Sequence, residues 1–199
     1  MILREILQEI PDAQVYGSDE VTVEGVCIDS RNCSRDDLFV CVQGFVQDGN
    51  RYAVSAAEQG AGSIMTGDID ALRQFAQEKG VTISEDGLAL AERTVPVVVV
   101  EDLRNALASA SACLWGNPTK KMTLIGITGT KGKTTTSYMV RSILTAAGLS
   151  SGMIGTICNY IGDERIETER TTPEANVIQP LFAKMVEQNI STCLIYREI

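Results

Sequence analysis

The chain contains no histidine. Histidine is the base in Ser-His-Asp and Cys-His catalysis and the commonest protein ligand of transition metals. Its absence excludes both kinds of catalysis within this chain, and it excludes any histidine-ligated metal. A metal here would have to be held by oxygen ligands, which suits Mg²⁺.

Long apolar runs are also absent. No stretch approaches the ~18–20 apolar residues that are needed to cross a bilayer. The first seven residues, Met1 to Leu7, mix charged side chains with apolar ones and lack the ordered regions of a signal peptide. We therefore expect a cytoplasmic protein with no membrane partner.

The cysteines lack the spacing of a metal or redox motif. No two of the six stand in a CxxC pattern. In a cytosolic chain we interpret them as reduced, small hydrophobic residues rather than as a disulfide framework or a zinc site. They are Cys27, Cys33, Cys41, Cys113, Cys158 and Cys193.

Positive charge is scarce. Lysine and arginine number 17 against 26 aspartates and glutamates, so the net charge is −9. This balance argues against a nucleic-acid partner that is bound through bulk electrostatics. A hydrophobic content of 44% and a charged content of 22% are ordinary for a soluble globular protein. The 199 residues suffice for one large domain or two small ones.

Strand and helix patterns alternate along the chain, which indicates an α/β fold with a largely parallel sheet. In the first half, helices are predicted at 2–10, 51–58 and 102–115, and strands at 21–28, 38–42, 64–65 and 97–100. The pattern restarts after a polar link at 116–121, with strands at 122–128, 152–157 and 191–196 and helices at 134–147 and 174–188. We place the domain boundary in this link, giving domains of residues 1–116 and 117–199.

A glycine-rich turn joins the first strand of the second domain to its first helix. It reads Gly126-Ile-Thr-Gly129-Thr-Lys-Gly132-Lys133-Thr134-Thr135. Glycines let backbone N–H groups approach phosphates, and a helix start adds partial positive charge. Lys133 would reach the β- and γ-phosphates of ATP, and the Thr134 hydroxyl would bind Mg²⁺. The general pattern requires glycine at 127, where this chain has Ile127, so a glycine-rich turn without a ligand is the alternative.

Residues 128–136, Thr128-Gly-Thr-Lys-Gly-Lys-Thr-Thr-Thr136, resemble the ATP loop of the Mur ligases, whose own glycine spacing is this variant one. Those enzymes build the peptide stem of bacterial peptidoglycan. Asp29-Ser30-Arg31, Asp37-Leu-Phe-Val-Cys-Val-Gln-Gly44 and Asp48-Gly49 resemble the first domain of the members that add the third stem residue. Met153-Ile-Gly-Thr156 and Arg170-Thr-Thr-Pro-Glu174 resemble their central domain.

The resemblance implies a fold and a reaction. The fold is a small N-terminal α/β uridine-nucleotide-binding domain, followed by the first part of a P-loop ATPase domain with a doubly wound parallel sheet. The reaction joins UDP-N-acetylmuramoyl-L-alanyl-D-glutamate to a diamino acid, either meso-diaminopimelate or L-lysine. ATP, with Mg²⁺, phosphorylates the D-glutamate carboxylate, and the incoming amine attacks the acyl phosphate. Between the two diamino acids, only the wider occurrence of diaminopimelate favours it.

The resemblance also implies site residues. The ATP site would comprise Gly129, Thr130, Lys131, Gly132, Lys133, Thr134 and Thr135, with Lys133 as the catalytic residue. The UDP substrate would be bound by Ser30, Arg31, Phe45, Val46, Gln47, Thr171 and Thr172. Simpler structural readings exist for several of these residues. Ser30-Arg31 is also a plain turn after a strand, Phe45 a core residue, and Thr172 an N-cap ahead of Pro173.

The resemblance ends after Ile195. There the family continues Glu-Val-Ser-Ser-His, with a Mg²⁺-binding glutamate, whereas this chain reads Tyr196-Arg-Glu-Ile199. We expect a fragment or a frameshifted product of a bacterial ligase, monomeric and without ligase activity on its own. The alternatives are a non-catalytic UDP-sugar or nucleotide-binding module, a different Mur ligase, a folylpolyglutamate synthase, or a generic P-loop NTPase.

Overall fold

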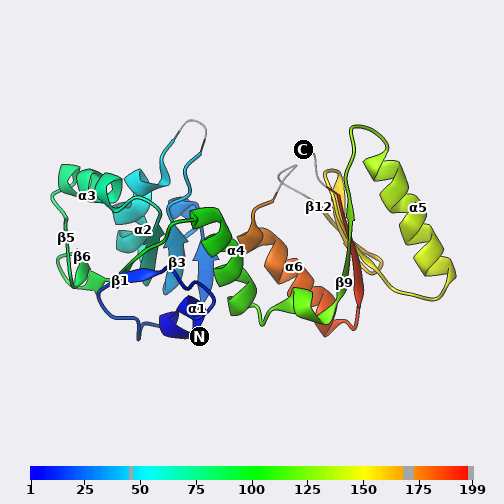
Figure 1. Cartoon of the computed structure of the whole chain (residues 1–199), viewed down its shortest axis with the longest axis horizontal. Helices are drawn as coiled ribbons and strands as arrows, with labels where there is room; N and C mark the ends of the chain where they lie inside the picture. Colours follow the sequence, from blue (N-terminus) through cyan, green and yellow to red (C-terminus); the bar gives the residue numbers. More distant parts are fainter. Residues whose placement is uncertain (45–46, 168–172, 197–199) are drawn as a thin grey trace. The chain divides into compact units, whose positions relative to one another are not determined.

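The computed structural model describes residues 1–44, 47–167 and 173–196. It divides the chain into two compact units, Met1–Leu114 and Trp115–Ile199 (Figure 1). Strands and helices alternate in both units, so the predicted α/β class is confirmed. Within the described part of the chain, no helix is both long and apolar enough to cross a membrane.

The first unit is built on a five-stranded sheet of order β1-β8-β4-β3-β2. β2, β3, β4 and β8 run parallel, and only β1 is antiparallel. The strands of the unit are β1 (Gln14–Tyr16), β2 (Gly25–Cys27), β3 (Asp37–Val40), β4 (Ser63–Thr66), β5 (Thr82–Ser84), β6 (Gly87–Ala89), β7 (Thr94–Val95) and β8 (Val97–Val99). β5, β6 and β7 form a separate antiparallel sheet.

Helices cover both faces of the five-stranded sheet. Its helical elements are α1 (Leu3–Leu7), η1 (Ser30–Asn32), η2 (Gly49–Tyr52), α2 (Ala53–Gln59), α3 (Ile69–Glu78) and α4 (Leu103–Leu114). Figure 1 shows α2 and α3 on one face and α1 and α4 on the other. α2 lies close to the sheet because its inward side chains are small, namely Ala53, Ala56 and Ala57. It ends at Gly60, whose φ of 120° suits glycine.

The parallel strands of this unit are buried on both faces, as continuous apolar runs predict. All four residues of β3 and all four of β4 are buried. Phe39 and Ile64 join the core that includes α2 and α3. Because β2, β3, β4 and β8 pair in parallel, their carboxyl ends lie at one edge of the sheet.

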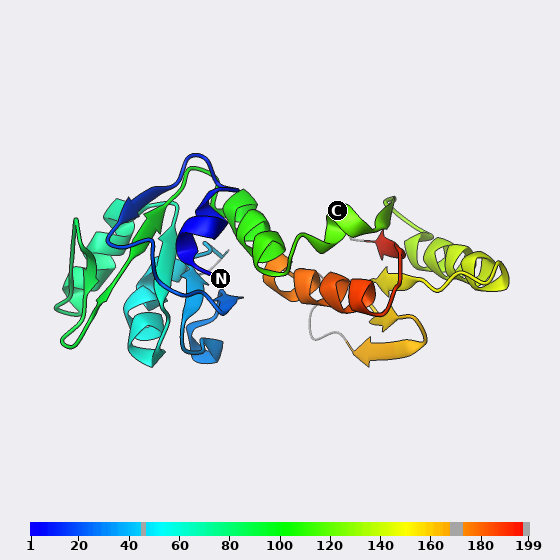
Figure 2. The ribbon, with the colours of Figure 1, turned by 90° about the horizontal axis from the view of Figure 1, so that it is seen from below.

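The second unit has a five-stranded sheet of order β12-β11-β10-β13-β9. Its elements are η3 (Pro118–Lys121), β9 (Thr123–Ile127), α5 (Lys133–Ala146), β10 (Gly152–Ile154), β11 (Cys158–Ile161), β12 (Glu164–Glu167), α6 (Ala175–Glu187) and β13 (Thr192–Tyr196). Adjacent residues of β10 pack on opposite sides, Met153 beneath α5 and Ile154 beneath α6. Figures 1 and 2 both show the two helices on opposite faces, the doubly wound arrangement.

Three details differ from the sequence prediction. The sheet of the second unit is mixed, because β11 runs antiparallel to β10, and a turn at Gly162 (φ 57°) then leads into β12, which is antiparallel to β11. The helix predicted at 134–147 carries two apolar rows, Met139-Ile143-Ala147 and Val140-Leu144, which predict a face that packs on the sheet, and only the second row faces the sheet. Val140 and Leu144 pack there, whereas Met139 and Ile143 stay 63% and 67% exposed.

The third difference concerns cysteine. Cys27 and Cys33 form a disulfide, so the interpretation of all six cysteines as reduced is wrong for this pair. The turn at η1 brings their Cα atoms to 5.8 Å, within the range that a disulfide spans. Sequence spacing alone did not reveal this proximity. The remaining cysteines are buried thiols.

Candidate functional site

The glycine-rich turn of the second unit connects β9 to α5. Two of its glycines hold backbone angles that favour glycine, with φ of 149° at Gly129 and 82° at Gly132. Gly132 is the N-cap of α5, and a Cβ placed there would meet nothing within 4 Å. The turn therefore leaves open space in front of the first turn of a 14-residue helix.

Lys133, the first residue of α5, folds back over this turn. Its Nζ donates a hydrogen bond to the Gly129 carbonyl at 2.6 Å. Its own carbonyl accepts a hydrogen bond from Ser137 Oγ at 2.8 Å. These contacts hold the ammonium group at the mouth of the turn, beside the backbone N–H groups of the helix start.

The first N–H groups of a helix have no intrahelical partners. In α5 the N–H of Thr136 bonds the Gly132 carbonyl at 2.9 Å, and the residues before it are Lys133, Thr134 and Thr135. Backbone donors, one ammonium group and the partial positive charge of the helix thus converge. This donor set fits a polyphosphate, and the partly exposed Thr134 hydroxyl is an oxygen ligand of the kind that Mg²⁺ accepts. Thr130 and Lys131 complete the turn and are exposed.

In the first unit, Ser30 and Arg31 lie in η1, directly after β2. Asp29 caps this turn, and its carboxylate accepts three hydrogen bonds from Arg31. Asp29 Oδ1 accepts from the Arg31 backbone N–H at 3.1 Å and from Nε at 2.9 Å, and Oδ2 accepts from Nη2 at 2.6 Å. The hydrogen bond to Asp29 raises the pKa of Arg31, which keeps the guanidinium charged. Ser30 is buried, whereas the Arg31 side chain is 83% exposed.

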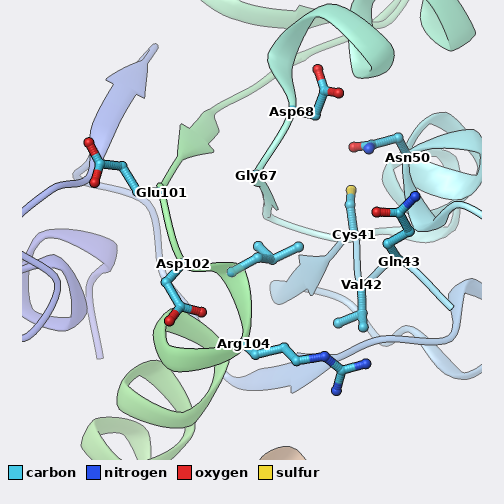
Figure 3. A pocket seen from close by; sticks show the side chains of 10 residues that line it. Cys41, Val42, Gln43, Asn50, Gly67, Asp68, Glu101, Asp102 and Arg104 are labelled. Carbon is cyan, nitrogen blue, oxygen red and sulfur yellow. The ribbon is translucent and has the colours of Figure 1, made fainter.

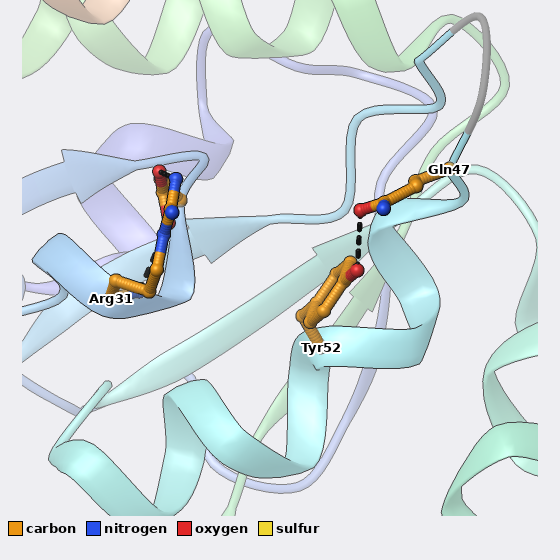
Figure 4. Close-up of polar contacts among 4 residues, drawn as sticks. Arg31, Gln47 and Tyr52 are labelled. Atoms are coloured by element: carbon orange, nitrogen blue, oxygen red, sulfur yellow. Dashed lines mark hydrogen bonds and ion pairs between the residues drawn. The ribbon is translucent and has the colours of Figure 1, made fainter.

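Gln47 follows β3, the neighbour of β2 in the sheet. Its Oε1 accepts a hydrogen bond from the hydroxyl of Tyr52 in η2 (Figure 4). Ser30, Arg31 and Gln47 therefore come from the carboxyl-terminal ends of adjacent parallel strands. The other predicted contacts of the UDP substrate, Phe45, Val46, Thr171 and Thr172, lie outside the described residues.

A pocket of about 520 Å³ opens at the same edge of this sheet (Figure 3). It is lined by segments that follow β3, β4 and β8. Its residues are Cys41, Val42, Gln43, Asn50, Gly67, Asp68, Glu101, Asp102, Leu103 and Arg104. No motif in the sequence marks this pocket, although ligands of parallel α/β sheets commonly bind outside the carboxyl ends of strands.

Polar side chains in the pocket are held in fixed positions. Asn50 is buried, and its Oδ1 accepts from Thr66 Oγ1 at 2.7 Å while its Nδ2 donates to Asp48 Oδ1 at 2.9 Å. Asp68 caps α3 and Asp102 accepts from the Asn105 N–H of α4. Burial raises the pKa of the Cys41 thiol far above its usual range. Cys41 is therefore a neutral wall of the pocket and no nucleophile.

Comparisons with known proteins identify a family. Residues 22–113 match the model of the Mur ligase family, catalytic domain, and residues 127–195 match the Mur ligase middle domain. A UDP-N-acetylmuramoyl-L-alanyl-D-glutamate–2,6-diaminopimelate ligase of Clostridium perfringens is 36% identical over 194 residues. That alignment covers 98% of this chain and 36% of the relative. The chain thus spans about a third of the length of the curated relatives it matches.

Solved structures show the same fold. A structure of UDP-N-acetylmuramoyl-L-alanyl-D-glutamate–2,6-diaminopimelate ligase matches with a TM-score of 0.71 and 21% identity, over 100% of this chain and 36% of that one. The MurF ligase of Thermotoga maritima in complex with ADP matches with a TM-score of 0.53 and 16% identity, over 87% of this chain and 32% of that one.

Proposed function

This chain belongs to the Mur ligase family, and from that premise we propose that its protein is an ATP-dependent ligase of peptidoglycan precursor synthesis. It would add the third stem residue, meso-diaminopimelate or L-lysine, to UDP-N-acetylmuramoyl-L-alanyl-D-glutamate. The diaminopimelate named for the Clostridium perfringens relative favours the first of these diamino acids.

The observation that carries the proposal is the turn between β9 and α5. Lys133 holds its ammonium over a turn that is open in front of a helix start, where it would neutralise the β- and γ-phosphates. The backbone N–H groups from Gly129 to Thr135 would bind the phosphate oxygens. Thr134 would help to hold Mg²⁺, which would supply positive charge next to the phosphates, and ATP would be the source of the phosphoryl group that activates the D-glutamate carboxylate. The protein contributes position and charge neutralisation.

The first unit would bind the uridine diphosphate part of the substrate. Arg31 is charged and exposed, and Ser30 offers a hydroxyl beside it. Phe45, Val46 and Gln47 would contact the nucleotide sugar, and Thr171 and Thr172 the muramoyl peptide, as the family resemblance implies. The domains would then divide the work, residues 1–116 binding UDP and residues 117–199 binding ATP. We further propose a monomer in the bacterial cytoplasm, where ATP is available, with no nucleic-acid or membrane partner.

Calorimetry with UDP-N-acetylmuramoyl-L-alanyl-D-glutamate tests the assignment on the 199-residue chain. Ser30→Ala and Arg31→Ala should each raise the dissociation constant by roughly five- to ten-fold, the effect of about 1–1.4 kcal/mol of lost hydrogen bonding. Arg35→Ala is the matched control, because Arg35 is exposed on the same unit and makes a 3.4 Å ion pair with its neighbour Asp36. Affinities that are equal in all variants, or no binding at all, would contradict the proposal.

A further inference from the structure

The disulfide between Cys27 and Cys33 closes the turn that carries Ser30 and Arg31. Cys27 is the last residue of β2, and Cys33 directly follows η1. The bond therefore ties the end of a sheet strand to the far side of the turn. Every residue from 28 to 32 lies inside the ring that it forms.

The two sulfur atoms differ in access. Cys33 is partly exposed, whereas Cys27 is buried at 7% exposure. The other four cysteines are buried thiols, and burial raises the pKa of one of them, Cys193, to about 12. A dissolved thiol or disulfide would reach Cys33 first. Disulfides of cytosolic proteins, where they occur, are usually transient and redox-sensing rather than structural.

We propose that Cys27 and Cys33 form a reversible thiol–disulfide site that controls binding at the uridine diphosphate end of the protein. The effect on binding rests on the function proposed above. The oxidant is a small-molecule disulfide. The Cys33 thiolate attacks one of its sulfurs and releases one thiolate, which leaves a mixed disulfide on Cys33. The Cys27 thiolate then attacks the Cys33 sulfur and releases the second thiolate. The two cysteine protons end on the two released thiols, and excess thiol reverses both steps.

The bond affects binding because it is the covalent constraint on a turn that is otherwise held by hydrogen bonds, among them the three that Asp29 accepts from Arg31. Inside the ring, the N–H of Asn32 bonds the Asp29 carbonyl at 3.0 Å, and the N–H of Cys33 bonds the Ser30 carbonyl at 3.4 Å. The Arg31 ion pair with Asp29 is exposed and weak in water. Reduction would let the turn sample more conformations, so Ser30 and Arg31 would have to be ordered again on binding. The oxidised form should therefore bind the UDP substrate more tightly.

Asp37 lies beside Cys27 and Cys33, so a metal ion bound by all three residues has to be excluded from the test. One oxygen of its carboxylate and both sulfurs lie within 4.8 Å of one another. In the reduced protein, these three groups would be able to hold a divalent cation, which would constrain the same turn. Reduced samples are therefore kept in EDTA, so that only the sulfur–sulfur bond distinguishes the two states.

The experiment compares the 199-residue chain after treatment with oxidised glutathione and with dithiothreitol. Peptide mass spectrometry should find the Cys27–Cys33 bond in the first sample and two thiols in the second. Hydrogen exchange of residues 28–32 should be at least five-fold faster after reduction. Calorimetry with UDP-N-acetylmuramoyl-L-alanyl-D-glutamate should give a three- to ten-fold higher dissociation constant. Cys33→Ser should reproduce the reduced values in both treatments, and Cys113→Ala should respond to the treatments as the unmodified chain does.

The outcomes separate the two proposals. Failure of the bond to form or reverse, or equal exchange rates in both samples, would overturn the redox site. Faster exchange with unchanged affinity, where Ser30→Ala still weakens binding, would overturn its control over binding and leave the proposed function standing. Absence of binding in both redox states would overturn the UDP assignment, while the exchange rates would still decide whether the turn responds to oxidation.

Discussion

The two candidate sites are assembled in opposite ways. The candidate phosphate site of the second unit consists of consecutive residues, 126–135, between one strand and one helix. The edge of the first unit collects short segments that follow four parallel strands, from Ser30 to Arg104. A site made of consecutive residues depends on local backbone geometry. A site made of segments from several strands depends on how those strands pair and on their register in the sheet. Substitutions should therefore act in different ways in the two units.

The largest expected effect is a loss of nucleotide affinity when a single side chain of the second unit is removed. Lys133→Ala removes the only ammonium group that contacts the turn among the described residues. Loss of a charged hydrogen bond of about 2–3 kcal/mol should weaken Mg·ATP binding by roughly 30- to 150-fold. Calorimetry with Mg·ATP measures this, and binding of the UDP substrate to the other unit should not change. Lys121→Ala, at an exposed lysine of the same unit, is the control. A three-fold loss or less would contradict the role of Lys133.

A smaller effect, on the free energy of unfolding, tests whether the backbone angles of the glycine-rich turn determine the second site. Gly132→Ala forces a Cβ into a left-handed conformation at a φ of 82°, which costs about 1–2 kcal/mol. Gly126→Ala is the matched control, because its φ lies outside the left-handed region and its added Cβ would meet nothing within 4 Å. It should leave the free energy of unfolding unchanged or raise it by up to about 0.5 kcal/mol. Urea unfolding, followed by circular dichroism, compares the two. Equal losses would contradict the idea that the left-handed backbone angle selects glycine at position 132.

The smallest effect concerns the first unit and its pH dependence. Burial raises the pKa of Asp37, while a hydrogen bond from the Ser34 N–H opposes the shift. A carboxyl group with a raised pKa ionises less readily in the folded state than in the unfolded chain. Its contribution is therefore fully present below the unfolded value and is lost as the pH rises through the folded value. The stability of this unit should accordingly fall as the pH rises from about 4.

Asp37→Asn should flatten that fall, because the amide does not ionise. Urea unfolding at several pH values between 4 and 7 provides the comparison. Glu58→Gln, which removes an exposed carboxylate on α2 of the same unit, controls for the change in net charge. A slope as steep in the Asn variant as in the unmodified chain would show that Asp37 is not the responsible group.

The contrast between the units also explains what could be predicted from sequence. The turn at 126–135 was identified because its glycines, its lysine and the apolar rows on either side are neighbours in the chain. The same holds for most of the strands and helices, whose apolar periodicity is local. The β11–β12 hairpin was missed because its two strands alternate weakly, although Gly162-Asp163 between them is a two-residue turn signal.

Contacts that depend on the folded path of the chain could not be predicted from the sequence. The bond of Cys27 with Cys33 needs the compact turn at η1, and the hydrogen bond of Asn50 with Thr66 needs the pairing of β3 with β4. The pocket beside them exists only when the ends of β3, β4 and β8 stand in register. Patterns in a single sequence do not reveal the order in which strands pair. The candidate site of the first unit depends on that order.

The hydrogen bond from Lys133 to the Gly129 carbonyl has a kinetic consequence. Because the lysine already bridges its own turn, the binding surface keeps its shape between encounters with nucleotide. When nucleotide binds, the Lys133 ammonium needs only to move its hydrogen bond from the Gly129 carbonyl to a phosphate oxygen. The loop does not have to fold beforehand. Such a site should capture nucleotide at a rate set by diffusion and orientation rather than by loop ordering.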